Sequence, residues 1–251
     1  MSKIKICGLK RPEDIETVNK YLPEYAGFVF YKKSRRYVTE EQAEKLRSLL
    51  DSKVTPVGVF VDAGKDEILR LMRKGIISVA QLHGNESEEY IRELKEELAK
   101  SGTFPEGKAY KTGGKIIKAF VFKKPEPGSD ITSHKKQETN EYIEKTRNDE
   151  INELNMRSRH RDVLEAAEKS YADYILFDNG YGSGEAFDWS ILKDFQRPYF
   201  LAGGLAPGNV SGAIKQLHPY GVDVSSGVET EGYKDAGKIG AFVREVRKEP
   251  V

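Results

Sequence analysis

The stretch "KIKICGLKRPEDI", residues 3–15, contains the pattern that decides the fold. Its first five residues form a short run with β-branched side chains at Ile4 and Ile6, which is typical of a strand. Gly8 follows the run, and Pro12 suits the first position of a helix. The stretch therefore predicts a strand, a turn and a helix, and it carries Cys7, the only cysteine of the chain, at the point where the strand ends.

The same strand–turn–helix unit recurs along almost the whole chain. Eight runs are short, apolar and rich in β-branched or aromatic residues, as expected of strands buried on both faces. These eight predicted strands cover residues 3–7, 26–30, 56–61, 78–82, 115–120, 174–178, 199–203 and 221–225.

Helix start signals fall between these runs. Thr39 and Gln42 form a capping box that predicts a helix through Leu50. Pro207, like Pro12, suits a first helical position. Asp188 is placed to cap a helix that begins at Trp189.

Eight strand–helix units predict a protein of the α/β class with a (β/α)8, or TIM, barrel. The alternative is an open doubly wound sheet, which often carries a glycine-rich dinucleotide fingerprint after its first strand. Here the first strand is followed by "CGLKRP" (7–12), which is not that fingerprint. The length of 251 residues fits one barrel, so we expect a single domain over residues 1–251.

Composition and charge exclude several classes of protein. Hydrophobic residues make up 38% and charged residues 32%, and the net charge is only +1, so no overall field favours nucleic acid or an anionic membrane. One cysteine cannot form an intrachain disulfide, and the N-terminus lacks a signal-peptide pattern. No apolar stretch approaches the ~18 residues of a membrane-spanning helix. We therefore expect a cytoplasmic protein with no nucleic-acid or membrane partner; the sequence does not specify its oligomeric state.

One segment interrupts the repeat. Residues 123–161, after the fifth predicted strand, hold 17 charged residues among 39 and six clearly apolar ones. Such a segment cannot form a core of its own, and its second part, from about Glu138, is compatible with a solvated helix. Two interpretations stay open: a solvated insertion without function, or a lid or partner-binding element, since loops after strands form the catalytic face of a barrel.

Residues that could carry chemistry lie at the ends of the predicted strands. Cys7 ends the first strand and Asp178 the sixth, and a thiol and a carboxyl group facing one pocket suit proton transfer in two directions. A cysteine acts as a base only where positive charge or a helix N-terminus stabilises its thiolate. The alternatives are a buried, inert Cys7 and an Asp178 that caps a helix or loop.

Other strand ends offer binding groups. Arg36, just past the second strand, could grip a carboxylate with its planar fork or be a surface cation. Gln81 and His83 end the fourth strand, where His83 could carry a proton, bind a ligand or be structural. No His, Cys and acid cluster has metal-ligand spacing, so no metal is expected.

Glycine-rich turns follow the last two strands. Gly203 and Gly204 follow the seventh strand, and Ser226 and Gly227 follow the eighth. The loops after strands seven and eight are the usual phosphate site of such barrels. The sequence therefore predicts a phosphate site here, the alternative being tight turns alone.

Taken together, these stretches resemble the phosphoribosylanthranilate isomerase family of tryptophan biosynthesis. The stretches that carry the resemblance are "KICGLKRPED" (5–14), "GFVFYKKSRRYVT" (27–39), "VGVFVD" (57–62), "QLHG" (81–84), "IKAF" (117–120), "LFDN" (176–179), "GSGEAFDWS" (182–190), "LAGGLAPGNV" (201–210) and "VDVSSGVE" (222–229). They follow the family's order and cover nearly the whole chain outside the insertion.

The resemblance implies an eight-stranded βα barrel and a cofactor-free Amadori rearrangement of N-(5-phosphoribosyl)anthranilate. It implies that Asp178 is the general acid, Cys7 the general base, and Arg36 the group that holds the anthranilate carboxylate. It places the phosphate at the Gly203–Gly204 and Ser226–Gly227 turns. Gln81 and His83 lie in a motif beside the pocket and receive a positioning role.

The chain departs from the family pattern at Glu185, where the family usually has a lysine. A reversed charge near an anionic substrate is expected to weaken binding if that lysine contributes to it. Two other functions are compatible with parts of the pattern: another phosphosugar isomerase, such as the histidine-pathway enzyme, and a non-catalytic phosphosugar-binding barrel. The histidine-pathway enzyme uses aspartates as both acid and base, so Cys7 at the end of the first strand disfavours that function. A non-catalytic barrel would not need Cys7, Asp178 and Arg36 together.

Overall fold

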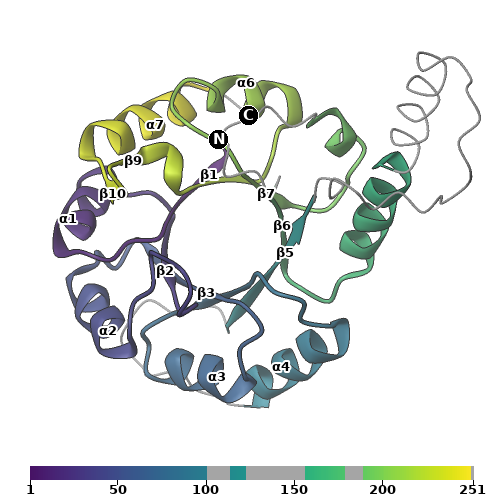
Figure 1. Cartoon of the computed structure of the whole chain (residues 1–251), viewed down its shortest axis with the longest axis horizontal. Helices are drawn as coiled ribbons and strands as arrows, with labels where there is room; N and C mark the ends of the chain where they lie inside the picture. The colour runs from purple at the N-terminus through teal and green to yellow at the C-terminus, as the bar shows by residue number, and fades with distance from the viewer. Residues whose placement is uncertain (101–113, 123–155, 179–188, 250–251) are drawn as a thin grey trace, which may run out of the picture.

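Eight parallel strands form a closed barrel in the computed structural model, which describes residues 1–100, 114–122, 156–178 and 189–249. Figure 1 shows the strands as an inner ring with the helices outside it. The strands are β1 (Lys3–Cys7), β2 (Tyr25–Val29), β3 (Thr55–Phe60), β4 (Val79–Leu82), β5 (Lys115–Val121), β6 (Tyr174–Asp178), β7 (Tyr199–Ala202) and β8 (Gly221–Val224). Each pairs with its neighbours in chain order, and β8 closes on β1. The predicted (β/α)8 barrel is confirmed, and each strand begins and ends within one residue of its predicted bounds.

The helices follow the strands in the expected alternation. They are α1 (Pro12–Tyr21), α2 (Glu40–Leu49), α3 (Lys65–Arg73), α4 (Glu88–Lys100), a helix over residues 156–169, α6 (Val210–Leu217) and α7 (Ala236–Lys248). Short 3₁₀ turns, η1 (Trp189–Leu192) and η2 (Ser226–Val228), follow β6 and β8. Between η2 and α7, β9 (Glu229–Thr230) and β10 (Tyr233–Lys234) form a small antiparallel pair. Among the described helices, none is long and apolar enough to cross a membrane.

The capping signals identify two of the helix starts correctly. Pro12 occupies the first turn of α1. In the capping box of α2, the Thr39 backbone N–H donates to Gln42 Oε1 at 2.9 Å, and the Gln42 backbone N–H donates to Thr39 Oγ1 at 3.2 Å.

The prediction at Pro207 is wrong, because a turn follows Pro207 and α6 begins only at Val210. Residues 123–155 of the expected insertion, and Asp188, lie outside the described residues.

Side chains alternate between two cores. Outward-facing residues of the strands, such as Ile4, Ile6 and Phe28, pack with the helices in the larger core. Inward-facing residues fill the barrel itself in a second, smaller core, whose buried members are Val57, Val79, Ile117, Ala119, Leu176, Phe200 and Ala202. This alternation follows from the two-residue period of a strand.

Aromatic rings close the N-terminal end of the barrel. Phe200 packs edge-on against Tyr25, Tyr174 and Tyr220 at centroid distances of 5.4, 5.9 and 5.4 Å. The hydroxyls of Tyr25 and Tyr220 lie 3.3 Å apart. This aromatic floor separates the barrel interior from solvent at one end, so the strands' carboxyl ends provide the accessible opening.

We expect Phe200→Ala to destabilise the protein by about 3–5 kcal/mol, because the lost ring leaves a cavity in the aromatic floor. Urea unfolding measures the effect. Leu49→Ala is the control, since Leu49 is 52% exposed and its truncation should cost less than about 0.5 kcal/mol. Equal effects of the two substitutions would contradict a packed floor.

Candidate active site

A cavity of about 410 Å³ opens at the carboxyl ends of the strands. Most of the predicted site residues line it: Cys7, Arg36, Gln81, His83, Asp178, Gly203, Gly204 and Ser226. Apolar side chains, including Val29, Val59 and Leu205, complete the wall. Residues from all eight strands or the loops that follow them are thus brought to one small-molecule-sized space, at the face where barrels carry their sites.

Cys7 is the last residue of β1, and its side chain lies inside the barrel beside Val29 and Val59. Gly27 on β2 makes room for it, because a Cβ there would lie 2.8 Å from the Cys7 Sγ. Burial raises the pKa of the Cys7 thiol, and the ammonium of Lys5 opposes that rise through its charge and a hydrogen bond. The thiol is therefore both enclosed and next to a cation.

Asp178 ends β6 and faces the same cavity. Its Oδ2 lies 3.6 Å from Nε2 of His83, and both side chains are about one quarter exposed. Gln81 Nε2 lies 3.0 Å from Nδ1 of His83, so the amide can donate to Nδ1 and direct the Nε2–H toward Asp178. Burial lowers the pKa of His83 against the opposing charge of Asp178, which favours the neutral ring.

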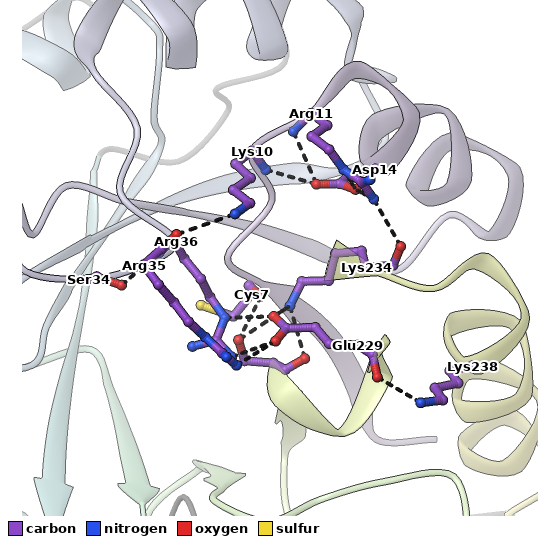
Figure 2. Close-up of polar contacts among 11 residues, drawn as sticks. Cys7, Lys10, Arg11, Asp14, Ser34, Arg35, Arg36, Glu229, Lys234 and Lys238 are labelled. Carbon is purple, nitrogen blue, oxygen red and sulfur yellow. Dashed lines mark hydrogen bonds and ion pairs between the residues drawn. The ribbon is translucent and has the colours of Figure 1, made fainter. Parts of the chain in front are cut away.

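Arg36 reaches the cavity from the loop after β2 and pairs with Glu229 (Figure 2). Its Nε and Nη2 donate to the two oxygens of Glu229 at 2.6 and 2.8 Å, while Nη1 takes no part in that pair. Gly8 permits this path of the side chain, since a Cβ at Gly8 would lie 2.3 Å from Arg36 Cδ. The guanidinium is thereby fixed beside the end of β1.

Glu229 gathers three cations. Besides Arg36, it binds Nη2 of Arg35 and Nζ of Lys234 at 2.8 and 2.7 Å (Figure 2). Burial alone would raise the pKa of Glu229, but the hydrogen bonds and charges of Arg36 and Lys234 outweigh it and lower that pKa to about 2. One carboxylate against three cations leaves an excess of positive charge at this wall of the cavity.

Lys234 links Glu229 and its cations to β1, the strand that ends at Cys7. Its Nζ donates to the backbone oxygen of Ser225 at 2.9 Å, and the Ser225 hydroxyl donates to the backbone oxygen of Cys7 at 3.0 Å. The side chain of Lys234 is 2% exposed. The small β9–β10 pair thus connects the cationic wall to the end of β1.

The glycine-rich turns lie side by side after β7 and β8. Gly203 and Gly204 line the cavity with φ values of +85° and +68°, a left-handed conformation that suits glycine. Ser226 lines the cavity too, whereas the lining does not include Gly227. A Cβ at Gly227 would lie 1.9 Å from the backbone oxygen of Leu205, so Gly227 is where the two turns pack against each other.

Four charged residues at or beside the cavity, among those the structure describes, were not predicted as site residues: Lys5, Asp223, Glu229 and Lys234. The sequence spacing could have predicted Lys5 as a site residue, because Lys5 lies two residues before Cys7 and therefore on the same face of β1. Asp223 is a charge inside an otherwise apolar strand. Glu229 and Lys234 had no such signal, since their role depends on the β9–β10 pair. Glu185 lies outside the described residues.

Fold and cavity together define the class of the protein: a (β/α)8 barrel whose catalytic face holds a cavity of small-molecule size, lined by apolar side chains and by cations, a thiol and a carboxylate. The chain belongs to the N-(5'-phosphoribosyl)anthranilate isomerase family, whose family model matches residues 4–116 and 131–245.

Individual relatives agree with this assignment. The chain is 38% identical over 252 residues to N-(5'-phosphoribosyl)anthranilate isomerase of Endomicrobium trichonymphae, covering 98% of this chain and 99% of that protein. It is similar to the crystal structure of phosphoribosyl anthranilate isomerase from Thermotoga maritima, with 30% identity, a TM-score of 0.71 and coverage of 99% and 100% of the two chains. It is also similar, at 30% identity, a TM-score of 0.69 and the same coverage, to a phosphoribosyl anthranilate isomerase in complex with reduced 1-(o-carboxyphenylamino)-1-deoxyribulose 5-phosphate.

The carboxylate of Glu229 should make stability depend on pH. Its folded pKa of about 2 lies below the ordinary 4.5, so its contribution is complete above pH 4.5 and is lost as the pH falls through about 2. We expect Glu229→Gln to be less stable than the wild type by about 1–3 kcal/mol near neutral pH. Urea unfolding should show this difference shrinking as the pH falls across that range.

The matched control for this prediction is Glu89→Gln. Glu89 also pairs with an arginine, Arg92, but the Glu89 side chain is 63% exposed. Exposed pairs contribute about 0–1 kcal/mol, so little change is expected. The free energy of unfolding of the wild type and of Glu229→Gln would then differ by the same amount from neutral pH to about pH 2 only if the cations did not hold the Glu229 carboxylate in its charged form. That result would contradict the assignment.

Proposed function

We propose that this chain catalyses the conversion of N-(5-phosphoribosyl)anthranilate to 1-(2-carboxyphenylamino)-1-deoxyribulose 5-phosphate in tryptophan biosynthesis. One observation carries the proposal: Cys7 and Asp178, a thiol and a carboxyl group, line the same cavity from β1 and β6. An Amadori rearrangement is an internal oxidation–reduction that needs proton transfers alone. Two titratable side chains at one substrate therefore provide the required chemistry.

Asp178 is assigned the role of general acid. Protonation of the furanose ring oxygen lets the C1–O bond break, and the nitrogen lone pair forms a Schiff base with C1. The position of Asp178 at a strand end, partly open to the cavity, supports this role. The neutral imidazole of His83, oriented by Gln81, supports a positioning role for these two residues.

Cys7 is assigned the role of general base. Its thiolate takes the proton from C2, and the C–H electron pair forms a C1–C2 double bond while the iminium electrons return to nitrogen. The resulting enolamine then tautomerises, with loss of the C2 hydroxyl proton and protonation of C1, to the ketone product. The enclosed position of Cys7 beside a lysine supports this role, because a thiolate needs a nearby cation.

The charged ends of the substrate fit the two sides of the cavity. The positive wall around Arg36 suits the anthranilate carboxylate, and Nη1 of Arg36 is the donor that the Glu229 pair does not use. The turns after β7 and β8 suit the phosphate: Gly203 and Gly204 expose backbone, and Ser226 adds a hydroxyl, while Gly227 holds the two turns together.

We also infer a cytoplasmic location. The lone Cys7 supports this, because a base of the kind proposed must stay a reduced thiol.

Replacing either proposed proton carrier should slow turnover strongly without abolishing binding. We expect Cys7→Ala and Asp178→Asn each to lower kcat by about 10²–10⁴-fold, measured as loss of substrate fluorescence. Calorimetric titration with the reduced product analogue should show affinity close to that of the wild type. A Cys7→Ala variant with wild-type kcat would move the base elsewhere, and binding without any wild-type turnover would favour the non-catalytic barrel.

Arg36→Lys should raise KM by about tenfold or more while lowering kcat less, because lysine keeps the charge but loses the planar fork. Steady-state kinetics measure the split. The matched control is Arg35→Lys: Arg35 binds the same Glu229 at 2.8 Å, but its side chain is 61% exposed and the cavity lining does not include it. The same rise in KM for both variants would contradict direct contact between Arg36 and the substrate.

A further inference from the structure

Lys5 is a buried charge that transfers no proton in the proposed reaction. It lies in the middle of β1 and is 0% exposed. Ile4 and Ile6 on either side belong to the outer core, so Lys5 and Cys7 share the inward face of the strand. The ammonium therefore lies inside the barrel, directly before the thiol in the run of inward-facing side chains.

Asp223 of β8 is the partner of Lys5. The two residues lie opposite each other in the register of the neighbouring strands, and Lys5 Nζ is 2.8 Å from Asp223 Oδ2. Asp223 is 8% exposed and lines the cavity, and its second oxygen, Oδ1, has no hydrogen-bond partner among the described residues. The ion pair thus lies at the inner end of the cavity next to Cys7.

Stability alone does not account for this pair. Removing two charges from water is costly, and replacing a buried ion pair with apolar residues is often neutral or stabilising. The surrounding interior is apolar, with Val57, Leu176 and Phe200 among its members. A lysine and an aspartate at this level of the barrel are therefore better explained by an effect on the neighbouring site.

We propose that Lys5 is a positioning residue that stabilises the thiolate form of Cys7 inside the barrel, and that Asp223 keeps the Lys5 ammonium charged and in place. The proposal rests on the role of Cys7 as the general base. Deprotonation of Cys7 releases its proton to solvent before substrate reacts, and the thiolate then lies beside the Lys5 ammonium. The barrel interior keeps water from screening this contact.

Charges on every side of Cys7 bear on its titration. Lys5 acts from β1 and Lys234 from β10, and both lower the pKa of the thiol, whereas burial and Asp223 raise it. Burial is the largest of these effects and the charge of Lys5 is the second, so the pKa of the thiol is raised overall and Lys5 limits that rise. Arg36 beside the end of β1 and the Asp178–His83 pair across the cavity complete the charged surroundings.

The state of Lys5 agrees with this role. Burial would lower the pKa of Lys5, but Asp223 and Cys7 together raise it, so the ammonium persists. Since Asp223 stabilises the ammonium yet repels the thiolate, removal of each partner should shift the thiol in opposite directions. Loss of Lys5 should raise the pKa of Cys7, and loss of Asp223 should lower it.

The experiment measures the thiol directly and does not require turnover. Cys7 is the only cysteine, so the rate of iodoacetamide incorporation against pH reports this one group. We expect Lys5→Met to move the midpoint of that profile upward by about 1–3 pH units, as for loss of an opposite charge close by. Asp223→Asn should move the midpoint downward.

Lys118→Met is the matched control. Lys118 is also a nearly buried lysine, with its Nζ 2.9 Å from Glu86 Oε2 and 2.7 Å from the backbone oxygen of Gly84. It is not among the main charges that shift the pKa of the Cys7 thiol. Its removal deletes a buried ion pair of the same kind and should leave the alkylation midpoint where the wild type has it.

If Lys5→Met does not fold because Asp223 is left unpaired, the double variant Lys5→Met/Asp223→Leu replaces it. The midpoint should still rise, because the charge of Lys5 acts on the thiol more strongly than that of Asp223. A midpoint that stays at the wild-type pH in either Lys5 variant, or moves equally in Lys118→Met, overturns the proposal.

Turnover then separates this inference from the proposed function. In an active enzyme, the rising limb of kcat/KM against pH should shift with the alkylation midpoint. A midpoint shift in a protein without isomerase turnover would support the Lys5–Cys7 contact and reject the proposed function. A kcat/KM limb that stays in place while the alkylation midpoint moves would reject the thiolate as the base.

Discussion

Because eight parallel strands close into a barrel, the side chain of each strand residue points either toward the helices or toward the barrel axis. Lys5 and Cys7 share the inward direction, and Ile4 and Ile6 share the outward one. A shift of one residue in β1 would move the thiol out of the cavity and bury isoleucines in its place. The registers of β1 with β2 and β8 therefore decide whether the site exists at all.

The two ends of the barrel have different physical tasks. At the N-terminal end, Phe200 and three tyrosines fill the interior and exclude water. At the other end, polar groups surround a cavity. Between them, the Lys5–Asp223 pair places charge in a medium of low polarity, where an electrostatic contact is stronger than at the surface.

The electrostatics of the site come from two groups of charges. Arg35, Arg36 and Lys234 surround Glu229 and leave positive charge at one wall, which suits an anionic substrate. Lys5 and Asp223 form an ion pair without net charge, and the charge of Lys5 changes the pKa of the thiol more than the charge of Asp223 does. In the proposed mechanism the first group binds the anionic substrate and the second acts on the ionisation of the base, while Lys234 contributes to both.

The sequence by itself determined the barrel and placed most of the predicted site residues at the cavity. The strand runs repeat eight times, and carboxyl ends of parallel strands must meet at one face, so Cys7, Gln81, His83 and Asp178 could be placed together without coordinates. Only the tertiary structure decided what surrounds them. Glu229 and Lys234 reach the site through the small β9–β10 pair, and Asp223 meets Lys5 because β8 closes on β1. The residues of the Arg36–Glu229 and Lys5–Asp223 pairs are more than 190 positions apart in the chain. Local patterns describe neighbours within a few residues, whereas charge pairs across a closed sheet depend on its register.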